Sequence, residues 1–176
     1  MQPERRVLPW WFSLLALLSL APAARADDLP EYRLKAAFLY NFALFTEWPA
    51  ELGTPLNVCI HGLDPFGKDI DELQGKAVGA RSIAVQRKAV AESLAGCQVV
   101  YVAPQAIGGL PRVLDGVRGR PVLTVADSPG AARQGVMLNM AVAQNRIAFE
   151  ANLQAARAAG LNLSSKLLRL ATDVQQ

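Results

Sequence analysis

Val99-Val100-Tyr101-Val102 is apolar on both faces of an extended chain, which is typical of a strand inside a parallel sheet. Similar short runs of apolar and β-branched residues occupy positions 56–61, 82–85 and 122–125. Most of these runs are followed by a turn and a helical pattern, at 66–73, 90–95 and 110–117. Because buried strands that alternate with helices form parallel sheets covered on both sides, the pattern predicts an α/β fold, a three-layer α/β/α sandwich.

A helix is predicted before this sheet. Aromatic and aliphatic side chains recur there at three- and four-residue spacing: Leu34, Phe38, Phe42 and Phe45. This spacing predicts an amphipathic, unusually aromatic helix that begins at Pro30 and ends at Trp48-Pro49.

The last third of the chain departs from the alternation. Two strand-like runs, 136–142 and 146–150, are joined by too few residues for a crossover helix, so they predict an antiparallel hairpin. Asn152 is expected to cap a helix that ends at Gly160, and Ser164 to cap a last helix that reaches Ala171. The predicted sheet is therefore mostly parallel, with a C-terminal antiparallel hairpin.

The first 26 residues have the pattern of an export signal. Arg5 and Arg6 precede an apolar run over 7–21, and the segment closes with small residues around Arg25. The alternative is a retained membrane anchor, but the run has about 15 residues where a spanning helix needs about 20. We expect cleavage after Ala26, a single domain over 27–176, a periplasmic location and no membrane insertion of the mature chain.

The charge of the mature chain gives little sign of a nucleic-acid partner. The full chain has 18 Lys and Arg against 15 Asp and Glu, and the signal removes Arg5, Arg6, Arg25 and Glu4. The remaining net charge is +1, and no basic stripe with interleaved aromatic residues remains. We therefore expect no nucleic-acid binding.

Two cysteines, Cys59 and Cys97, remain after the signal. An even number of cysteines in an oxidising compartment favours a disulfide, and the alternative is two buried, unpaired thiols.

The sequence contains no recognisable catalytic set. Residues 62–69 resemble a phosphate-binding loop, but Asp69 replaces the Ser or Thr that binds magnesium, and Pro65 removes a backbone donor. A plain turn is therefore expected. His61 is the single histidine, and no nucleophile elbow accompanies it. We expect no enzymatic activity, no cofactor and no metal site.

Six polar residues follow the predicted strands and would lie at their carboxyl ends, where open α/β sheets bind ligands. They are His61, Asp64, Arg87, Gln105, Asp127 and Ser128. One hypothesis is that they line a single crevice for a small ligand. The alternative for His61 is a partly buried imidazole at a strand end with no ligand.

Several segments resemble the YfiR family of exported bacterial proteins. They are residues 34–42, 45–49, 64–67, 121–125, 146–153 and 164–171, and they occur in the family's order along nearly the whole mature chain. The resemblance implies a periplasmic repressor that binds the periplasmic sensor domain of an inner-membrane diguanylate cyclase and lowers cyclic-di-GMP, and it suggests a homodimer. Cys59 and Cys97 fit one disulfide of the family, whereas a second disulfide expected near the 130s has no counterpart here.

The partner would then contact the last third of the chain. The candidate contact residues are Phe149, Glu150, Leu153, Leu163 and Leu167. The alternative, favoured for the leucines, is that these side chains cover the sheet. A rival function is a periplasmic small-ligand-binding sensor module.

Overall fold

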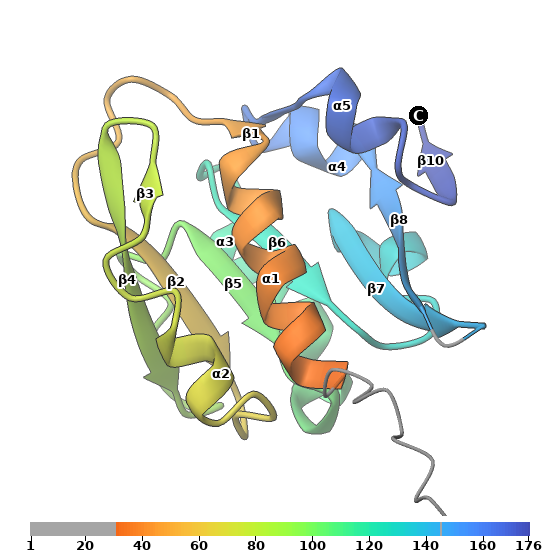
Figure 1. Ribbon diagram of the computed structural model, residues 1–176, viewed down its shortest axis with the longest axis horizontal. Coiled ribbons are helices and arrows are strands. Elements are labelled where there is room, and N and C mark those ends of the chain that lie inside the picture. The colour runs from red at the N-terminus through yellow and green to blue at the C-terminus, as the bar shows by residue number, and fades with distance from the viewer. Residues whose placement is uncertain (1–30, 145) are drawn as a thin grey trace, which may run out of the picture.

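A computed structural model describes residues 31–144 and 146–176 as a twisted sheet with helices on both faces (Figure 1). The eight strands of this sheet lie in the order β10-β8-β7-β6-β5-β2-β4-β3. Five neighbouring pairs are parallel, and the pairs β3–β4 and β7–β8 are antiparallel. The predicted α/β class with a mostly parallel sheet is therefore confirmed.

The strands are β1 (Thr46–Glu47), β2 (Leu56–His61), β3 (Ala77–Val78), β4 (Arg81–Lys88), β5 (Val99–Val102), β6 (Leu123–Ala126), β7 (Leu138–Ala143), β8 (Arg146–Asn152), β9 (Asn162–Leu163) and β10 (Asp173–Gln175). The α-helices are α1 (Glu31–Leu44), α2 (Lys68–Asp71), α3 (Leu110–Val117), α4 (Leu153–Ala158) and α5 (Ser165–Leu168). Two 3-10 helices are η1 (Pro104–Gly109) and η2 (Ala132–Gln134).

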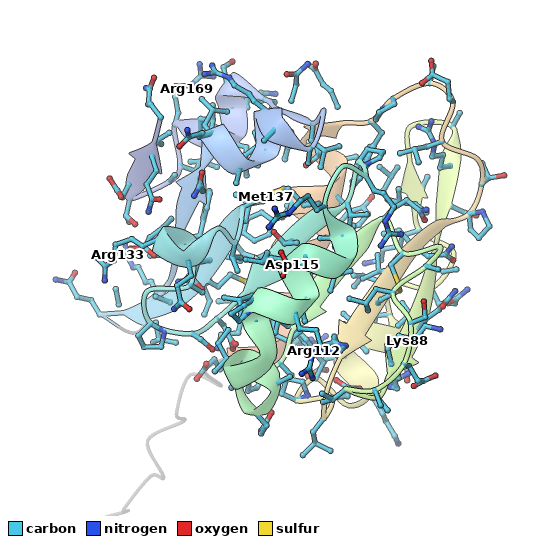
Figure 2. The ribbon with its side chains drawn as sticks, turned by 180° about the vertical axis from the view of Figure 1, so that it is seen from behind. Lys88, Arg112, Asp115, Arg133, Met137 and Arg169 are labelled. Carbon is cyan, nitrogen blue, oxygen red and sulfur yellow. A yellow bond between two sulfur atoms is a disulfide. The ribbon has the colours of Figure 1, made fainter. Side chains whose placement is uncertain are left out.

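The sheet separates two hydrophobic cores. We call the side under α1 the α1 face; its core includes Leu39, Phe42 and Phe149. The rings of Phe42 and Phe149 meet edge to face, with centroids 5.0 Å apart, so α1 is held against the hairpin. The other side, the α3 face, is turned toward the viewer in Figure 2. It has a separate core that includes Cys59 and Val113. Strands buried on both sides need apolar residues at every position, which is the pattern of β5.

Helix α1 ends earlier than its aromatic spacing predicts. It stops at Leu44 because the next residues form β1, which pairs antiparallel with β9. Side chains beyond the helix satisfy its last carbonyl groups: the Thr46 hydroxyl donates to Phe42 O at 2.7 Å, and the Trp48 indole donates to Ala43 O at 2.9 Å. The expected start at Pro30 lies outside the described residues.

The hairpin and both helix caps are confirmed. Strands β7 and β8 pair antiparallel from Leu138 opposite Ala151 onward. The Asn152 side chain accepts a hydrogen bond from Ala155 N at 2.8 Å, and the Ser164 hydroxyl accepts one from Leu167 N at 3.2 Å. Helices α4 and α5 are shorter than predicted because β9 follows the first and β10 follows the second.

One predicted helix is wrong. Residues 90–95 form an irregular segment, because the side chains of Glu92 and Ser93 accept hydrogen bonds from the backbone N–H groups of Ala89 and Ala95. Such local side-chain bonds compete with a helical backbone. The helix expected over 66–73 is limited to α2, and the strand expected over 82–85 extends to the full length of β4.

The predicted signal peptide and its cleavage site lie outside the described residues. Within the part of the chain that the structure describes, no helix combines the length and the apolar character needed to cross a bilayer.

Candidate functional site

The six polar residues expected to share one crevice are divided between the two faces of the sheet. Arg87, Asp64 and Asp127 lie on the α1 face: Arg87 pairs with Asp64 and with Asp71 of α2, and Asp127 pairs with Lys35 of α1. His61 lies on the α3 face, in a cavity beside α3. Gln105 is exposed on η1, and Ser128 is buried, with its backbone N–H donating to the Asn139 side chain at 3.2 Å.

Arg87 joins the end of β4 to the turn that precedes α2. Its guanidinium lies 2.8 Å from a carboxylate oxygen of Asp64 and 2.8 Å from one of Asp71, and it donates to Gly67 O at 2.9 Å. Hydrogen bonds to Asp71 and Asp64 raise the pKa of Arg87. Asp64 also accepts from Phe66 N at 2.7 Å. The phosphate-loop-like segment is therefore a turn closed by its own side chains, with Asp64 occupied by two partners.

Lys35 and Asp127 form a buried ion pair that sequence reasoning missed. Lys35 Nζ lies 2.6 Å from Asp127 Oδ2, and the two side chains are 5% and 1% exposed. Tyr32 donates to the same oxygen at 3.3 Å, and Glu31 pairs with Lys35 from the preceding turn. Burial by itself lowers the pKa of Lys35, but the hydrogen bonds to Asp127 and Glu31 outweigh it and raise the pKa. The lysine is therefore charged at neutral pH.

A signal for this ion pair is present in the sequence. Lys35 occupies the buried stripe of α1 together with Leu39 and Phe42, at the spacing that marks the inward face of a helix. A lysine on such a stripe requires a buried partner, because an unpaired charge in a core is very costly. Tyr101 lies nearby with a buried hydroxyl, and burial followed by the charge of Asp127 raises the pKa of Tyr101.

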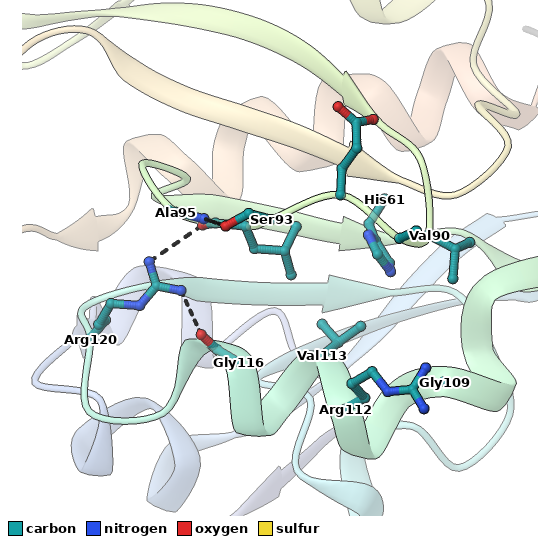
Figure 3. Close-up of a pocket in the computed structure, with 12 residues that line it drawn as sticks. His61, Val90, Ser93, Ala95, Gly109, Arg112, Val113, Gly116 and Arg120 are labelled. Carbon is teal, nitrogen blue, oxygen red and sulfur yellow. Dashed lines mark hydrogen bonds between the residues drawn. The ribbon is translucent and has the colours of Figure 1, made fainter.

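His61 occupies a cavity of about 660 Å³ on the α3 face (Figure 3). Its lining includes His61, Val90, Ser93, Arg112, Val113 and Arg120. The imidazole is 3% exposed, and its Nδ1 has no hydrogen-bond partner among the described residues. A buried polar atom without a partner costs about 1–3 kcal/mol. Burial lowers the pKa of His61, so the imidazole is neutral at pH 7.

The irregular segment 89–96 creates this cavity. It crosses the α3 face without packing as a helix, and it is fixed at one end by the disulfide between Cys97 and Cys59 of β2. Arg120 fixes it to the end of α3 by donating to Leu94 O at 3.3 Å and to Gly116 O at 2.6 Å (Figure 3). The predicted pairing of the two cysteines is confirmed, with Cα atoms 5.9 Å apart.

The residues proposed as partner contacts are mostly buried within this chain. Phe149 is 2% exposed, Leu167 2%, and Leu163 and Leu153 are also in the core of the α1 face. Glu150 is half-buried and accepts a hydrogen bond from the Asn139 side chain at 3.2 Å. The leucines therefore cover the sheet, and a partner that binds this region would contact the exposed residues beside them.

These features define an α/β protein whose charged residues at the strand ends are mostly bound to one another. Within residues 31–144 and 146–176, no group of three or more His, Cys, Asp or Glu side chains is placed to hold a metal ion. The model of the YfiR/HmsC-like family matches residues 32–172. The chain belongs to this family, and the resemblance drawn from its sequence is confirmed.

Proposed function

We propose that this protein is exported to the periplasm and represses an inner-membrane diguanylate cyclase by binding the cyclase's periplasmic sensor domain. The observation that carries the proposal is the match to the YfiR/HmsC-like family over residues 32–172. The disulfide between Cys59 and Cys97 supports export, because such bonds persist in oxidising compartments. Lys35 is paired with Asp127 and Arg87 with Asp64, and this internal pairing of both cations supports a binding role over a catalytic one.

Repression follows from differential affinity. A cyclase that exchanges between active and inactive conformations is driven toward the one that the repressor binds more tightly. The repressor needs no chemistry of its own for this effect. Its folded surface must discriminate between two shapes of the sensor domain, and the output is less cyclic-di-GMP.

The proposed contact surface lies on the C-terminal elements. Because Leu163 and Leu167 are buried, the partner would meet the exposed residues next to them, above all Leu170, whose side chain is 71% exposed. Glu150 lies on β8, beside β10, and is only half-buried, so a partner can still contact it. The resemblance also implies a homodimer, which sedimentation of the purified protein measures directly.

Deletion of the gene tests the function. Cyclic-di-GMP, measured by mass spectrometry of cell extracts, should rise, and the full-length gene should restore the original level. A gene lacking residues 1–26 should fail to restore it, because its product stays in the cytoplasm. An unchanged nucleotide level in a strain that contains a cyclase with a periplasmic domain contradicts the proposal. Co-purification of that cyclase with the protein from detergent-solubilised membranes tests the contact itself.

A further inference from the structure

The cavity beside His61 combines features that the proposed repression does not use. It lies on the α3 face, between the carboxyl end of β2, the segment 89–96 and helix α3 (Figure 3). The contact surface proposed for the cyclase lies on the C-terminal elements instead. The cavity therefore calls for an explanation of its own.

The buried imidazole is the first feature. His61 is 97% buried, it lines the cavity, and its Nδ1 meets no donor or acceptor in the described part of the chain. Buried polar atoms in native proteins are nearly always satisfied, so an imidazole with an unpartnered nitrogen that also lines a cavity is a candidate contact for a small polar partner, a water molecule included. A neutral imidazole has one donor and one acceptor nitrogen, so it can donate a hydrogen bond to an oxygen atom of that partner.

The charge of the lining is the second feature. Arg112 is exposed on α3, and its guanidinium forms none of the ion pairs found among the described residues. Arg120 adds a second positive charge, although its N–H groups donate to Leu94 O and Gly116 O. Glu92 supplies one negative charge, and its carboxylate accepts from the backbone at Ala89. The lining thus has a net positive charge, with one guanidinium available to an anion.

The walls are the third feature. Val90, Leu94 and Val113 present aliphatic side chains around the charged groups. A ligand that fills the cavity must therefore have an apolar body as well as an anionic group, since apolar walls favour apolar surface.

We propose that this cavity binds a small organic anion, whose carboxylate contacts Arg112 and His61 and whose apolar body packs on Val90 and Val113. The site is distinct from the phosphate-loop-like turn, because Asp64 of that turn binds Arg87 of β4 on the opposite face. It is also independent of the proposed cyclase contact.

Because His61 is the single histidine, its imidazole signals in an NMR spectrum report on the cavity without any assignment. The protein is purified from the periplasm without a histidine tag, and benzoate and decanoate are titrated as probes. Saturable shifts of the imidazole signals are expected with at least one probe. The tighter probe shows whether the cavity prefers a ligand with a flat aromatic ring, as in benzoate, or with a linear alkyl chain, as in decanoate. Acetate and benzamide, which lack the apolar body and the charge respectively, should bind much more weakly.

Arg112→Ala should weaken binding of the better probe about tenfold or more, because a charge-assisted hydrogen bond is lost. Arg133→Ala removes an exposed arginine from η2, away from the cavity in Figure 2, and should leave the affinity unchanged. Both side chains are exposed, so neither substitution threatens the fold. No saturable shift with either probe, equal affinity for benzamide and benzoate, or equal affinity of the Arg112→Ala variant and the unmodified protein would each overturn the proposal.

Discussion

Lys35 and Asp127 show how a single buried charge depends on its partner. The Asp127 side chain is 1% exposed. Replacing Lys35 with Met would leave its carboxylate buried, with the Tyr32 hydroxyl as the remaining partner among the described residues. Breaking a buried pair from one side typically costs about 3–5 kcal/mol. We therefore expect Lys35→Met to lower the free energy of unfolding by about 3 kcal/mol, measured by urea denaturation followed by circular dichroism.

Two further variants separate charge from packing at this pair. Lys166→Met changes an exposed lysine on α5 and should cost less than about 0.5 kcal/mol. The double variant Lys35→Met with Asp127→Leu should be more stable than Lys35→Met alone, since no unpaired charge remains buried. If Lys35→Met costs no more than Lys166→Met, the ion pair does not stabilise the fold as argued.

His61 makes stability depend on pH in a defined direction. Its pKa in the folded protein is below the ordinary value of 6.5, because burial disfavours the imidazolium, so the unfolded chain takes up the proton first. The free energy of unfolding should therefore fall as pH drops below 6.5, and this part of the fall should vanish in His61→Gln. Urea denaturation at several pH values measures both curves. Parallel curves for the two proteins would contradict the assignment.

At this scale, the sequence predicts the residues whose role is local. Asn152 and Ser164 are correctly identified as helix caps, because a cap needs only a polar side chain at the right offset from the helix. Lys35 was missed, because its partner Asp127 is 92 positions away and only the folded sheet brings them together. His61 lies at the strand end where the sequence predicts it. The sequence did not show that its side chain lies on the α3 face, whereas Asp64 lies on the α1 face.

The segment 89–96 is the element whose structure depends most on a covalent bond. The disulfide ties Cys97 to β2 across a sequence separation of 38 residues. Replacing both cysteines with Ala should lower the free energy of unfolding by about 2–4 kcal/mol, measured by urea denaturation. Amide hydrogen exchange should also speed up in 89–96 more than in β5, because the segment loses its anchor beside the cavity. Equal protection of 89–96 in both proteins would contradict this role.

The same segment shows why element type is hard to predict from a short stretch. Residues 90–95 contain alanine, leucine and glutamate, which favour a helix, yet Glu92 and Ser93 bind nearby backbone N–H groups instead. The short strands β1, β9 and β10 were missed for a related reason. Each has two or three residues and exists only because a distant strand lies beside it, as β8 lies beside β10.

For the whole molecule, the alternation of buried strands and helices was enough to predict the α/β class, and the short connection between the last two strand-like runs predicted the C-terminal hairpin. The order of strands could not be predicted, because it depends on which crossover connections place β4 and β5 on opposite sides of β2. The connections also determine which face each helix covers. Helix α1 covers the face with the Lys35 ion pair, and α3 covers the face with the cavity of His61.

The proposed partner surface gives a test at the scale of the whole molecule, because two leucines are almost equally exposed at different ends of the fold. Leu170 is 71% exposed and follows α5, whereas Leu63 is 70% exposed and lies between β2 and α2. Helices α5 and α2 lie at opposite ends of the fold in Figure 1. Leu170→Asp should abolish co-purification with the cyclase and raise cyclic-di-GMP to the level of the deletion strain, since a charge would be buried at the contact. Leu63→Asp should leave both unchanged.

Neither substitution removes a buried side chain, so both proteins should unfold at the same urea concentration as the unmodified chain, within about 0.5 kcal/mol in free energy. This measurement separates a lost contact from a lost fold. If Leu170→Asp represses as well as Leu63→Asp at equal periplasmic abundance, the cyclase does not bind beside α5. The contact must then be sought on another face, and the proposed repression is judged by the deletion experiment, which tests it separately.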